Sequence, residues 1–356
     1  MKQKILAINP GSTSTKIAVY EDKNIVFKKT IKHDSQFINS FEKIIDQYTF
    51  RKKAIIDILT KEKITLSSLD AVVGRGGMLK PTMSGTYLVN DKMIEYVNKA
   101  PRGEHASNLG CVLAKEIADE INKPAFIVDP VSVDEMEEIA RYTGMPKIKR
   151  QSLFHALNQK AVGLKAANNL NKDYHDLNLI IAHLGGGVSV GIHQKGKVVD
   201  VNNALDGDGP MSPERSGTVP LGPLYKMAFS GKYTLKDIKR MNYGNGGVTA
   251  YLGTNDGFEF ERLINEGNKK AIFIIDVMCY QIAKEIGSAA TVLKGEVDAI
   301  VLTGGLAYIT YITNAIKERT SFISDILIFP GEDEMESLAF GALRVLTAEE
   351  NYKEYI

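Results

Sequence analysis

Two stretches decide the fold: ILAINPGSTSTKI at residues 5–17 and IIAHLGGGVSVGI at residues 180–192. They align without a gap at an offset of 180 − 5 = 175, with identical residues at five positions. A second pair, DAVVGRGG at 70–77 and DAIVLTGG at 298–305, has five identities at an offset of 298 − 70 = 228. Each stretch is a β-rich run that ends in a Gly-rich turn, and their order is kept. The sequence therefore predicts two similar halves.

Predicted strands and helices alternate through the chain, which is typical of an α/β protein with helices on the faces of its sheets. The two offsets differ by 228 − 175 = 53 residues, so the second half carries an insertion, which we place near 200–260. We expect a first domain over 1–150 and a second over 151–337. A closing helix over 338–356 can pack back on the first domain.

Composition limits the partners of this protein. The 356 residues include 44 basic and 43 acidic ones, a net charge of +1 that gives no strong field for nucleic acid or anionic membrane. The two cysteines, Cys111 and Cys279, exclude a disulfide scaffold and a zinc site. No apolar run approaches the length of a membrane span. We expect a cytoplasmic protein with a small-molecule partner.

Duplicated α/β halves predict a cleft between them to which each half offers Gly-rich turns. Of the 31 glycines, 14 lie between Gly185 and Gly253. This density indicates that backbone comes close to a ligand there. A long flexible surface loop is the alternative.

The first turn, Asn9 to Lys16, offers backbone N–H groups, the hydroxyls of Ser12 and Ser14, and the ammonium of Lys16. This set suits phosphoryl oxygens. The stretch is not a Walker A loop, because no second glycine precedes Lys16 and no long helical pattern follows. A polar hairpin with a solvated lysine is the alternative.

The matching turn of the second half has three consecutive glycines, Gly185, Gly186 and Gly187, after His183. Such a run costs conformational entropy, so close approach of a nucleotide polyphosphate is its simplest explanation. Gly304-Gly305 joins a predicted strand to a helix whose free N–H groups suit a phosphate or adenosine. Simple packing also explains a Gly-Gly pair at a strand end.

Charged residues at predicted strand ends and in loops complete the candidate site. Arg75 and Arg215 lie among small residues that leave a guanidinium free to bind a carboxylate or phosphate. Asp129 ends a strand, where open α/β sheets place ligand groups. Glu336 begins the last helix, either as a Mg2+ ligand or as an acidic cap. His155 stands alone in the sequence, a position that is more often structural than catalytic.

Together these residues resemble the acetate kinase family, and within it the shorter butyrate-type members. The family signature Asn-x-Gly-Ser-x-Ser-x-Lys occurs at residues 9–16. The other family motifs follow in family order: Arg75-Gly76-Gly77, Arg102-Gly103-Glu104-His105, Asp129, Phe154-His155, His183-Leu184-Gly185, Arg215, Gly304-Gly305 and Glu336-Ser337-Leu338-Ala339. Val72 and Gly186 stand where acetate-type members carry Arg and Asn.

The resemblance implies a fold of two duplicated ribonuclease H-like domains around a nucleotide cleft, as in actin, sugar kinases and heat-shock ATPases. It also implies a role for each site residue. Asn9, Ser12, Ser14 and Lys16 would lie near the phosphoryl groups, and Asp129 with Glu336 would position Mg2+. Arg75 would hold the substrate carboxylate, and His155 and Arg215 would stabilise the phosphoryl group in flight. His183, Gly185, Gly186, Gly187, Gly304 and Gly305 would face ATP.

The implied activity is reversible, ATP-dependent phosphorylation of a short-chain fatty acid, butyrate or a branched relative, to an acyl phosphate by direct in-line transfer. ATP or ADP and Mg2+ would be the cofactors, and a homodimer or higher homo-oligomer the assembly. Two alternatives stay open. One is an acetate or propionate kinase, and the other is a nucleotide-switched binding protein of the actin or chaperone kind.

Overall fold

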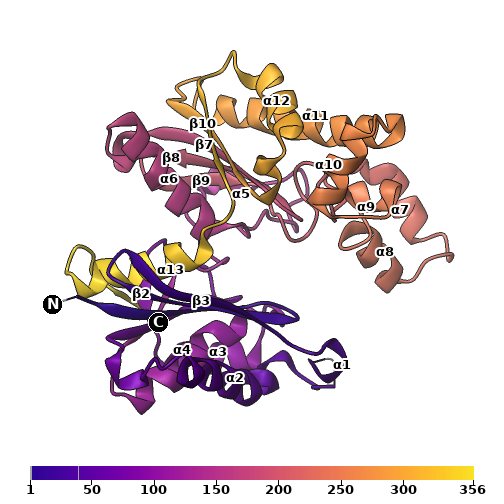
Figure 1. Ribbon diagram of the computed structural model, residues 1–356. Coiled ribbons are helices and arrows are strands. Elements are labelled where there is room, and N and C mark those ends of the chain that lie inside the picture. Colours follow the sequence, from indigo (N-terminus) through magenta and orange to yellow (C-terminus); the bar gives the residue numbers. More distant parts are fainter. Residues whose placement is uncertain (1, 39) are drawn as a thin grey trace. The chain divides into compact units, whose positions relative to one another are not determined.

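The computed structural model describes residues 2–38 and 40–356 (Figure 1). The chain divides into two compact units. The first consists of Met1–Val133 and Asp333–Ile356, and the second is Asp134–Glu332. The first unit thus ends 150 − 133 = 17 residues before the boundary expected from the sequence, and the C-terminal residues belong to it.

The first unit contains a seven-stranded sheet with the order β12-β5-β6-β4-β1-β2-β3. The first three strands form an antiparallel meander, β4 and β6 extend it in parallel, and β5 runs antiparallel to β6. The strands are β1 (Lys4–Pro10), β2 (Ser14–Glu21), β3 (Asn24–Lys32), β4 (Ala71–Arg75), β5 (Thr86–Leu88), β6 (Ala125–Val128) and β12 (Lys353–Glu354).

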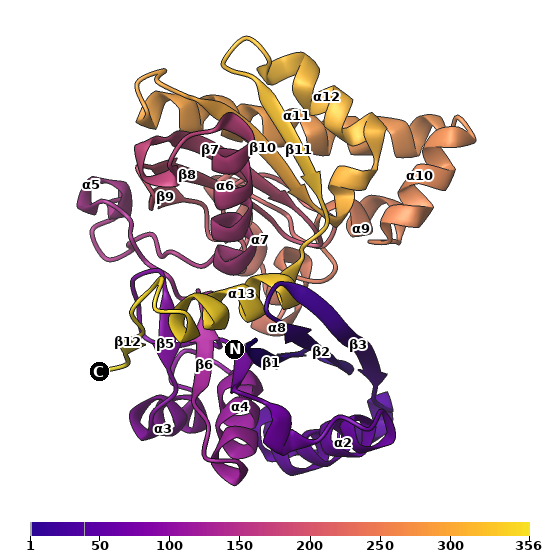
Figure 2. The same cartoon turned by 60° about the vertical axis from the view of Figure 1, so that its left-hand side comes forward.

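Helices cover both faces of this sheet, with α13 opposite α2 and α4 (Figure 2). On the α2 and α4 face, Leu6, Ile8 and Val72 pack with Ile55 and Leu109 in one core. Alternate residues of β1 point to opposite faces, so this strand, covered on both sides, is apolar over its central residues 5–8. The helices are α1 (Ser35–Ile38), η1 (Ile44–Gln47), α2 (Tyr48–Lys61), η2 (Leu66–Ser68), α3 (Asp91–Lys99), α4 (Asn108–Glu120) and α13 (Glu334–Leu346).

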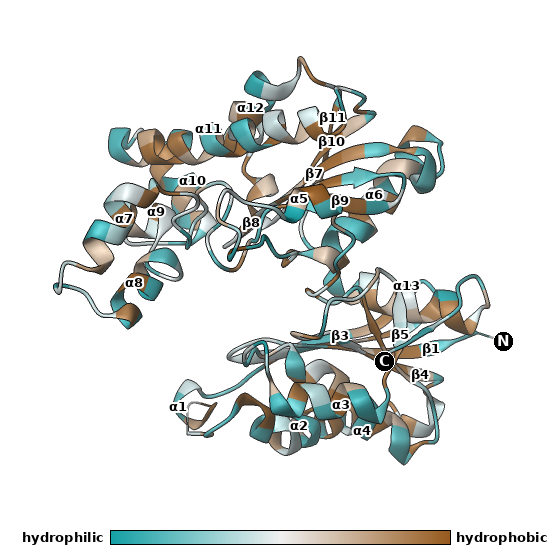
Figure 3. Cartoon of the chain, turned by 180° about the vertical axis from the view of Figure 1, so that it is seen from behind, coloured by the Kyte–Doolittle hydropathy of each residue, from teal (hydrophilic) through white to brown (hydrophobic). Residues whose placement is uncertain are grey.

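The second unit contains a five-stranded sheet with the order β11-β10-β7-β8-β9. Its strands are β7 (Asn178–Leu184), β8 (Val188–Gln194), β9 (Lys197–Val201), β10 (Ala299–Gly304) and β11 (Ile326–Pro330). The two central strands, β7 and β10, are hydrophobic along their length (Figure 3). Ile180 and Ala182 pack under α11, whereas Leu179 and Ile181 pack under α6.

The helices of the second unit include a group, α7 to α10, that lies between β9 and α11 in the chain. The unit has α5 (Glu138–Arg141), α6 (Ala156–Leu170), η3 (Tyr174–Asp176), α7 (Leu221–Ala228), α8 (Leu235–Asn242), α9 (Gly247–Leu252), α10 (Gly257–Asn265), α11 (Lys269–Val292), η4 (Gly305–Tyr308) and α12 (Thr310–Thr320). Across residues 2–38 and 40–356, no helix is long and apolar enough to cross a membrane.

The duplication predicted from the two sequence repeats is confirmed by the topology. Five strands follow the same order in both sheets, β3-β2-β1-β4-β6 in the first and β9-β8-β7-β10-β11 in the second. The copies differ by one residue in register, because Ile5 pairs with Ala71 whereas Ile180 pairs with Ile300, one residue beyond the repeat partner of Ala71. The Gly-rich turns of both repeats follow equivalent strands.

Candidate active site

The turn between β1 and β2 presents polar groups as the sequence predicts. Gly11 N donates to Ser14 O at 2.8 Å and closes the turn, which leaves the Ser12 side chain exposed. Lys16 lies on β2 with an exposed side chain. Asn9 at the end of β1 is buried, and its amide donates to the Glu334 carboxylate. The turn therefore presents the Ser12 hydroxyl and the Lys16 ammonium to solvent beside a fixed asparagine.

A buried guanidinium that the sequence did not reveal lies under this turn. Arg51 of α2 is fully buried and donates to Ser12 O at 3.0 Å, Ser14 O at 2.9 Å and Thr15 Oγ1 at 3.0 Å. Two further bonds reach Gln47 Oε1. Burial lowers the pKa of Arg51 to about 10, so it remains a cation at neutral pH. Because three of these five bonds reach residues 36 to 39 positions away in the chain, no local sequence pattern indicates it.

Arg75, at the end of β4, already binds a carboxylate of this chain. Its Nη1 lies 2.7 Å from Glu334 Oε1, and 3.5 Å from Asn9 Oδ1. The flanking glycines serve packing rather than leaving the guanidinium free. A Cβ at Gly74 would lie 2.0 Å from Gly110 O, and one at Gly76 would lie 2.5 Å from Pro130 Cβ. The guanidinium is therefore held by Glu334, which the sequence analysis missed.

Asp129 and Glu336 both belong to the first unit. Asp129 directly follows β6 with a positive φ of 36°, and its Oδ1 accepts from Ser84 Oγ at 2.6 Å and Gly85 N at 2.8 Å. These bonds fix the direction of its carboxylate. Glu336 lies in the first turn of α13, where its charge is favourable to the helix dipole. Burial, then Glu336, raise the pKa of Tyr20 to about 12.

The two carboxylates suit a Mg2+ that is held largely by phosphates. Within residues 2–38 and 40–356, no three His, Cys, Asp or Glu side chains gather closely enough to hold a metal ion by themselves. Mg2+ in phosphoryl-transfer sites needs only one or two carboxylates besides the substrate phosphates and waters. The oriented Asp129 carboxylate, with hydrogen bonds to one oxygen, is the kind of ligand that such an ion uses.

In the second unit, two histidines stack on each other. The rings of His155 and His183 lie 3.8 Å apart at 11°. His183 Nδ1 lies 2.7 Å from Asn158 Oδ1, and because an amide oxygen only accepts, Nδ1 carries the proton. His155 Nδ1 lies 2.9 Å from Ser189 Oγ, and Gln159 Nε2 donates to the same hydroxyl oxygen at 2.8 Å. His155, isolated in the sequence, is thus part of a pair held by α6 and β8.

Arg215 lies beside the glycine turn of residues 185–187. A Cβ at Gly187 would lie 2.0 Å from Arg215 Nη1, so only glycine leaves room for the guanidinium. Ser212 Oγ donates to Gly186 O at 2.8 Å, and Glu214 N donates to the same oxygen at 3.1 Å. The sequence placed both features in the site, and the structure shows that they contact each other.

The turn at Gly304-Gly305 packs against Leu184, which directly precedes the turn of residues 185–187. Gly304 has φ of 89°, and a Cβ there would lie 2.4 Å from Leu184 O. At Gly305 an added Cβ would meet no atom within 4 Å, so this residue faces open space. Packing against Leu184 explains Gly304, whereas no close packing constrains Gly305.

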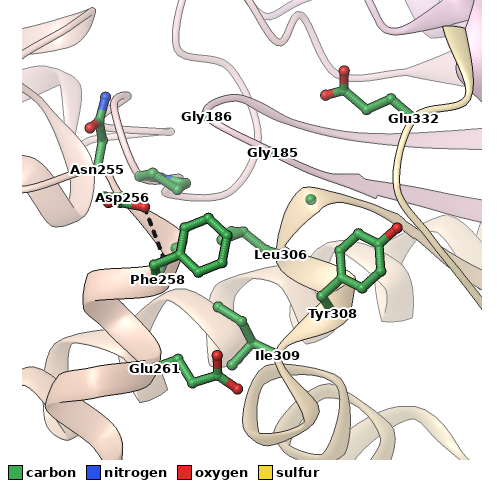
Figure 4. Close-up of a pocket in the computed structure, with 13 residues that line it drawn as sticks. Gly185, Gly186, Asn255, Asp256, Phe258, Glu261, Leu306, Tyr308, Ile309 and Glu332 are labelled. Atoms are coloured by element: carbon green, nitrogen blue, oxygen red, sulfur yellow. Dashed lines mark hydrogen bonds between the residues drawn. The ribbon is translucent and has the colours of Figure 1, made fainter.

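A cavity of about 560 Å³ opens where these turns meet α10 and η4 (Figure 4). Its volume is within the usual range of ligand sites. The rings of Phe258 and Tyr308 border it, and both are more than two-thirds exposed. The lining residues are Gly185, Gly186, Pro213, Asn255, Asp256, Gly257, Phe258, Glu261, Gly305, Leu306, Tyr308, Ile309 and Glu332. Such exposed aromatic rings have no distinctive sequence pattern, so they could not be predicted from the sequence.

The match to a family model decides the family. Residues 140–329 match the model of the acetokinase family, which covers more than half of the 356 residues. The chain belongs to the acetokinase family. The matched range includes His155, His183, Arg215 and the glycine turns at 185–187 and 304–305.

Solved structures similar to this acetokinase-family chain agree on the fold. An acetate kinase from Porphyromonas gingivalis has a TM-score of 0.79 at 21% identity, with 98% of this chain and 100% of that chain covered. A propionate kinase from Francisella tularensis subsp. tularensis has a TM-score of 0.76 at 20% identity, with 95% of this chain and 98% of that chain covered. An acetate kinase from Entamoeba histolytica has a TM-score of 0.76 at 17% identity, again with 95% of this chain and 98% of that chain covered. The predicted two-domain, actin-like ATPase fold is confirmed.

Proposed function

We propose that this acetokinase-family chain is an ATP-dependent kinase that phosphorylates the carboxylate of a short-chain fatty acid, butyrate or a branched relative. The reaction would be reversible toward ATP. One observation carries the proposal: the turn of residues 185–187 borders the cavity with Gly185 and Gly186, while Gly187 contacts the Arg215 guanidinium. One turn thus connects a nucleotide-sized cavity to a cation suited to the transferring phosphoryl group.

The cavity supports ATP as the nucleotide. Gly185, Gly186 and Gly305 let backbone N–H groups approach phosphates without obstruction by side chains. Phe258 and Tyr308 offer aromatic faces on which a purine ring can stack. In our proposal the base lies toward these rings and the phosphates toward the glycines.

The chemistry needs cations rather than a general base. A fatty-acid carboxylate, with a pKa near the ~4.3 of Glu, is ionised at pH 7. One of its oxygens attacks the γ-phosphorus, the bond from phosphorus to the ADP oxygen breaks, and the electron pair stays on ADP. No proton has to move. Catalysis then consists of positioning and of charge stabilisation, as in other phosphoryl transfers.

The residues divide these roles. Arg215 and His155 would stabilise the transferring group, and Lys16 would neutralise phosphate charge. Arg75 forms an ion pair with Glu334 in this structure. It would release Glu334 and bind the substrate carboxylate instead. Bound Mg2+, held by Asp129 and Glu336, would supply positive charge to the phosphate oxygens.

Two positions support the butyrate-type assignment. Val72, where acetate-type members carry arginine, is fully buried in the core of the first unit and cannot reach a substrate. In our proposal the guanidinium of Arg75, at the end of the same strand, binds the acid in place of that arginine. Gly186 replaces an asparagine of acetate-type members and borders the cavity.

A hydroxamate assay tests the proposal. The purified chain is incubated with Mg-ATP and each acid from two to five carbons, including branched ones, and acyl phosphate is trapped with hydroxylamine. We expect the highest kcat/KM with butyrate or a branched acid of similar size. A maximum at acetate or propionate would assign the chain to those substrates. If no acid is phosphorylated and ATP is hydrolysed without acid, the nucleotide-switch alternative holds instead.

We also propose that two copies of the chain associate. One apolar face of the long helix α11 is buried in the core of its own unit, and that face is therefore not available for association. Exposed apolar side chains on α7, directly after it and on α8 support association, with Leu221, Phe229 and Leu235 at 62, 89 and 71% exposure. Sedimentation velocity at micromolar concentration should give a mass of twice the 39.2 kDa of one chain. A species of 39.2 kDa throughout would contradict it.

A further inference from the structure

Tyr243, at the C-terminal end of α8, holds the side chain of Arg215. The Arg215 guanidinium carbon lies 4.8 Å from the centre of the Tyr243 ring. The two residues also form an isolated antiparallel β-bridge, and Tyr243 N donates to Lys239 O at 2.8 Å. The backbone of Tyr243 is therefore fixed on both sides, and its ring supports the cation.

The backbone around Arg215 is fixed as well. A Cβ at Gly247 would lie 1.9 Å from Ser212 O, and one at Gly246 would lie 2.7 Å from Ser216 N. Together with the bonds to Gly186 O, these close approaches leave little backbone freedom in this segment. The side-chain torsions of Arg215 are then restricted by the Tyr243 ring on one side and by the space that Gly187 leaves on the other.

The charge of Arg215 is not neutralised by a carboxylate. Among the described residues no ion pair involves Arg215, and the neighbouring Glu214 carboxylate accepts from Asn255 at 2.5 Å. Arg215 Nε is buried without a hydrogen-bond partner in the described part of the chain. An orphaned buried donor is costly, which indicates that an anion satisfies it in the working state.

From these contacts we propose that Tyr243 is a positioning residue for phosphoryl transfer, acting through Arg215. A carboxylate partner would hold the guanidinium but cancel its charge. An aromatic face holds it by the cation–π interaction and leaves the charge and the N–H fork for an anion. The inference rests on the proposed function, because the anion it assigns to Arg215 is the transferring phosphoryl group.

Three variants test the role. Tyr243→Phe keeps the ring, Tyr243→Leu removes it, and Tyr142→Leu is the matched control, because the Tyr142 ring lies at the same 4.8 Å from Lys149 Nζ. We expect Tyr243→Leu to lower kcat by about two- to thirty-fold, the range for loss of one cation–π contact. KM for the acid should stay within about two-fold, and the other two variants should match the wild type.

A second readout needs no kinase activity. Phenylglyoxal modifies accessible guanidinium groups, and mass spectrometry of the peptide that holds Arg215 gives its rate. We expect faster modification of Arg215 in Tyr243→Leu than in the wild type or Tyr243→Phe, because the ring no longer covers one face. Equal circular dichroism spectra exclude a general loss of fold.

The outcomes separate the two proposals. If the wild type phosphorylates no acid, the proposed function fails, and the modification rate still tests the contact. If the wild type is active but Tyr243→Leu matches it in kcat and in Arg215 modification, the positioning role is overturned. It is overturned equally if Tyr243→Phe is as impaired as Tyr243→Leu, since the hydroxyl rather than the ring would then matter.

Discussion

Replacing Arg51 with methionine should weaken both the first unit and its affinity for ATP. Arg51 is fully buried in α2 and makes five hydrogen bonds. Three of these bonds hold the β1–β2 turn, whose hydroxyls we assign to the phosphoryl groups. Methionine fills a similar volume but leaves these acceptors without a donor.

The magnitude follows from the bonds that are lost. Each buried acceptor that loses its partner costs about 1 kcal/mol or more, and the relief from burying a charge offsets part of the sum. Burial of the charge shows in the lowered pKa of Arg51, about 10. We therefore expect the free energy of unfolding to fall by about 3 kcal/mol. KM for ATP should rise about ten-fold as the turn loosens, equivalent to ~1.4 kcal/mol.

The assay combines urea unfolding with steady-state kinetics. Lys53→Met is the control, because Lys53 lies on the same helix with an exposed side chain. It should change stability by less than about 0.5 kcal/mol. The reasoning is refuted if Arg51→Met matches Lys53→Met in both unfolding free energy and KM for ATP.

Further predictions concern the cations, the cavity and pH. Arg215→Ala should lower kcat by roughly 10³-fold, as for arginine fingers, and turnover within a few-fold of wild type would contradict its role. Phe258→Ala should raise KM for ATP several-fold with little change in kcat, and an unchanged KM would place the base elsewhere. Burial, and then the charge of Arg51, lower the pKa of His33 to about 4 from its usual 6.5. The unfolded chain therefore binds the proton first, and the free energy of unfolding should fall as pH drops from about 6.5 to about 4. His33→Gln should flatten that slope, as measured by urea unfolding at several pH values.

The duplicated architecture was predictable because it depends on local patterns. A buried strand that runs into glycines is visible in one sequence, and two collinear copies specify equivalent strands in two sheets. The glycine turns at 185–187 and 304–305 lie at the cavity as expected, with Gly305 facing open space.

Contacts between distant residues could not be predicted in this way. The glycines around Arg75 suggested a free guanidinium, whereas Gly74 makes room for the Gly110 carbonyl, Gly76 makes room for Pro130, and Glu334 binds Arg75. Arg51 of α2 could not be singled out in the sequence, because it binds the carbonyls of Ser12 and Ser14, 39 and 37 residues away.

The glycine-rich stretch from Gly185 to Gly253 had two interpretations, close approach to a ligand or a flexible loop. The structure gives a third reason for several of its glycines, which is close packing of the chain on itself. Gly187 makes room for Arg215, Gly209 for Asn202, and Gly247 for the carbonyl of Ser212. These close approaches shape the segment that carries Arg215.

The central claim is that the phosphoryl group passes from ATP to a carboxylate. Phosphorus NMR of the purified chain with Mg-ATP and butyrate tests it most directly. The account predicts that the γ-phosphate signal disappears as an acyl phosphate signal appears, in equal amount with ADP and only when the acid is present. Inorganic phosphate formed at the same rate with and without acid, and no acyl phosphate, would contradict it.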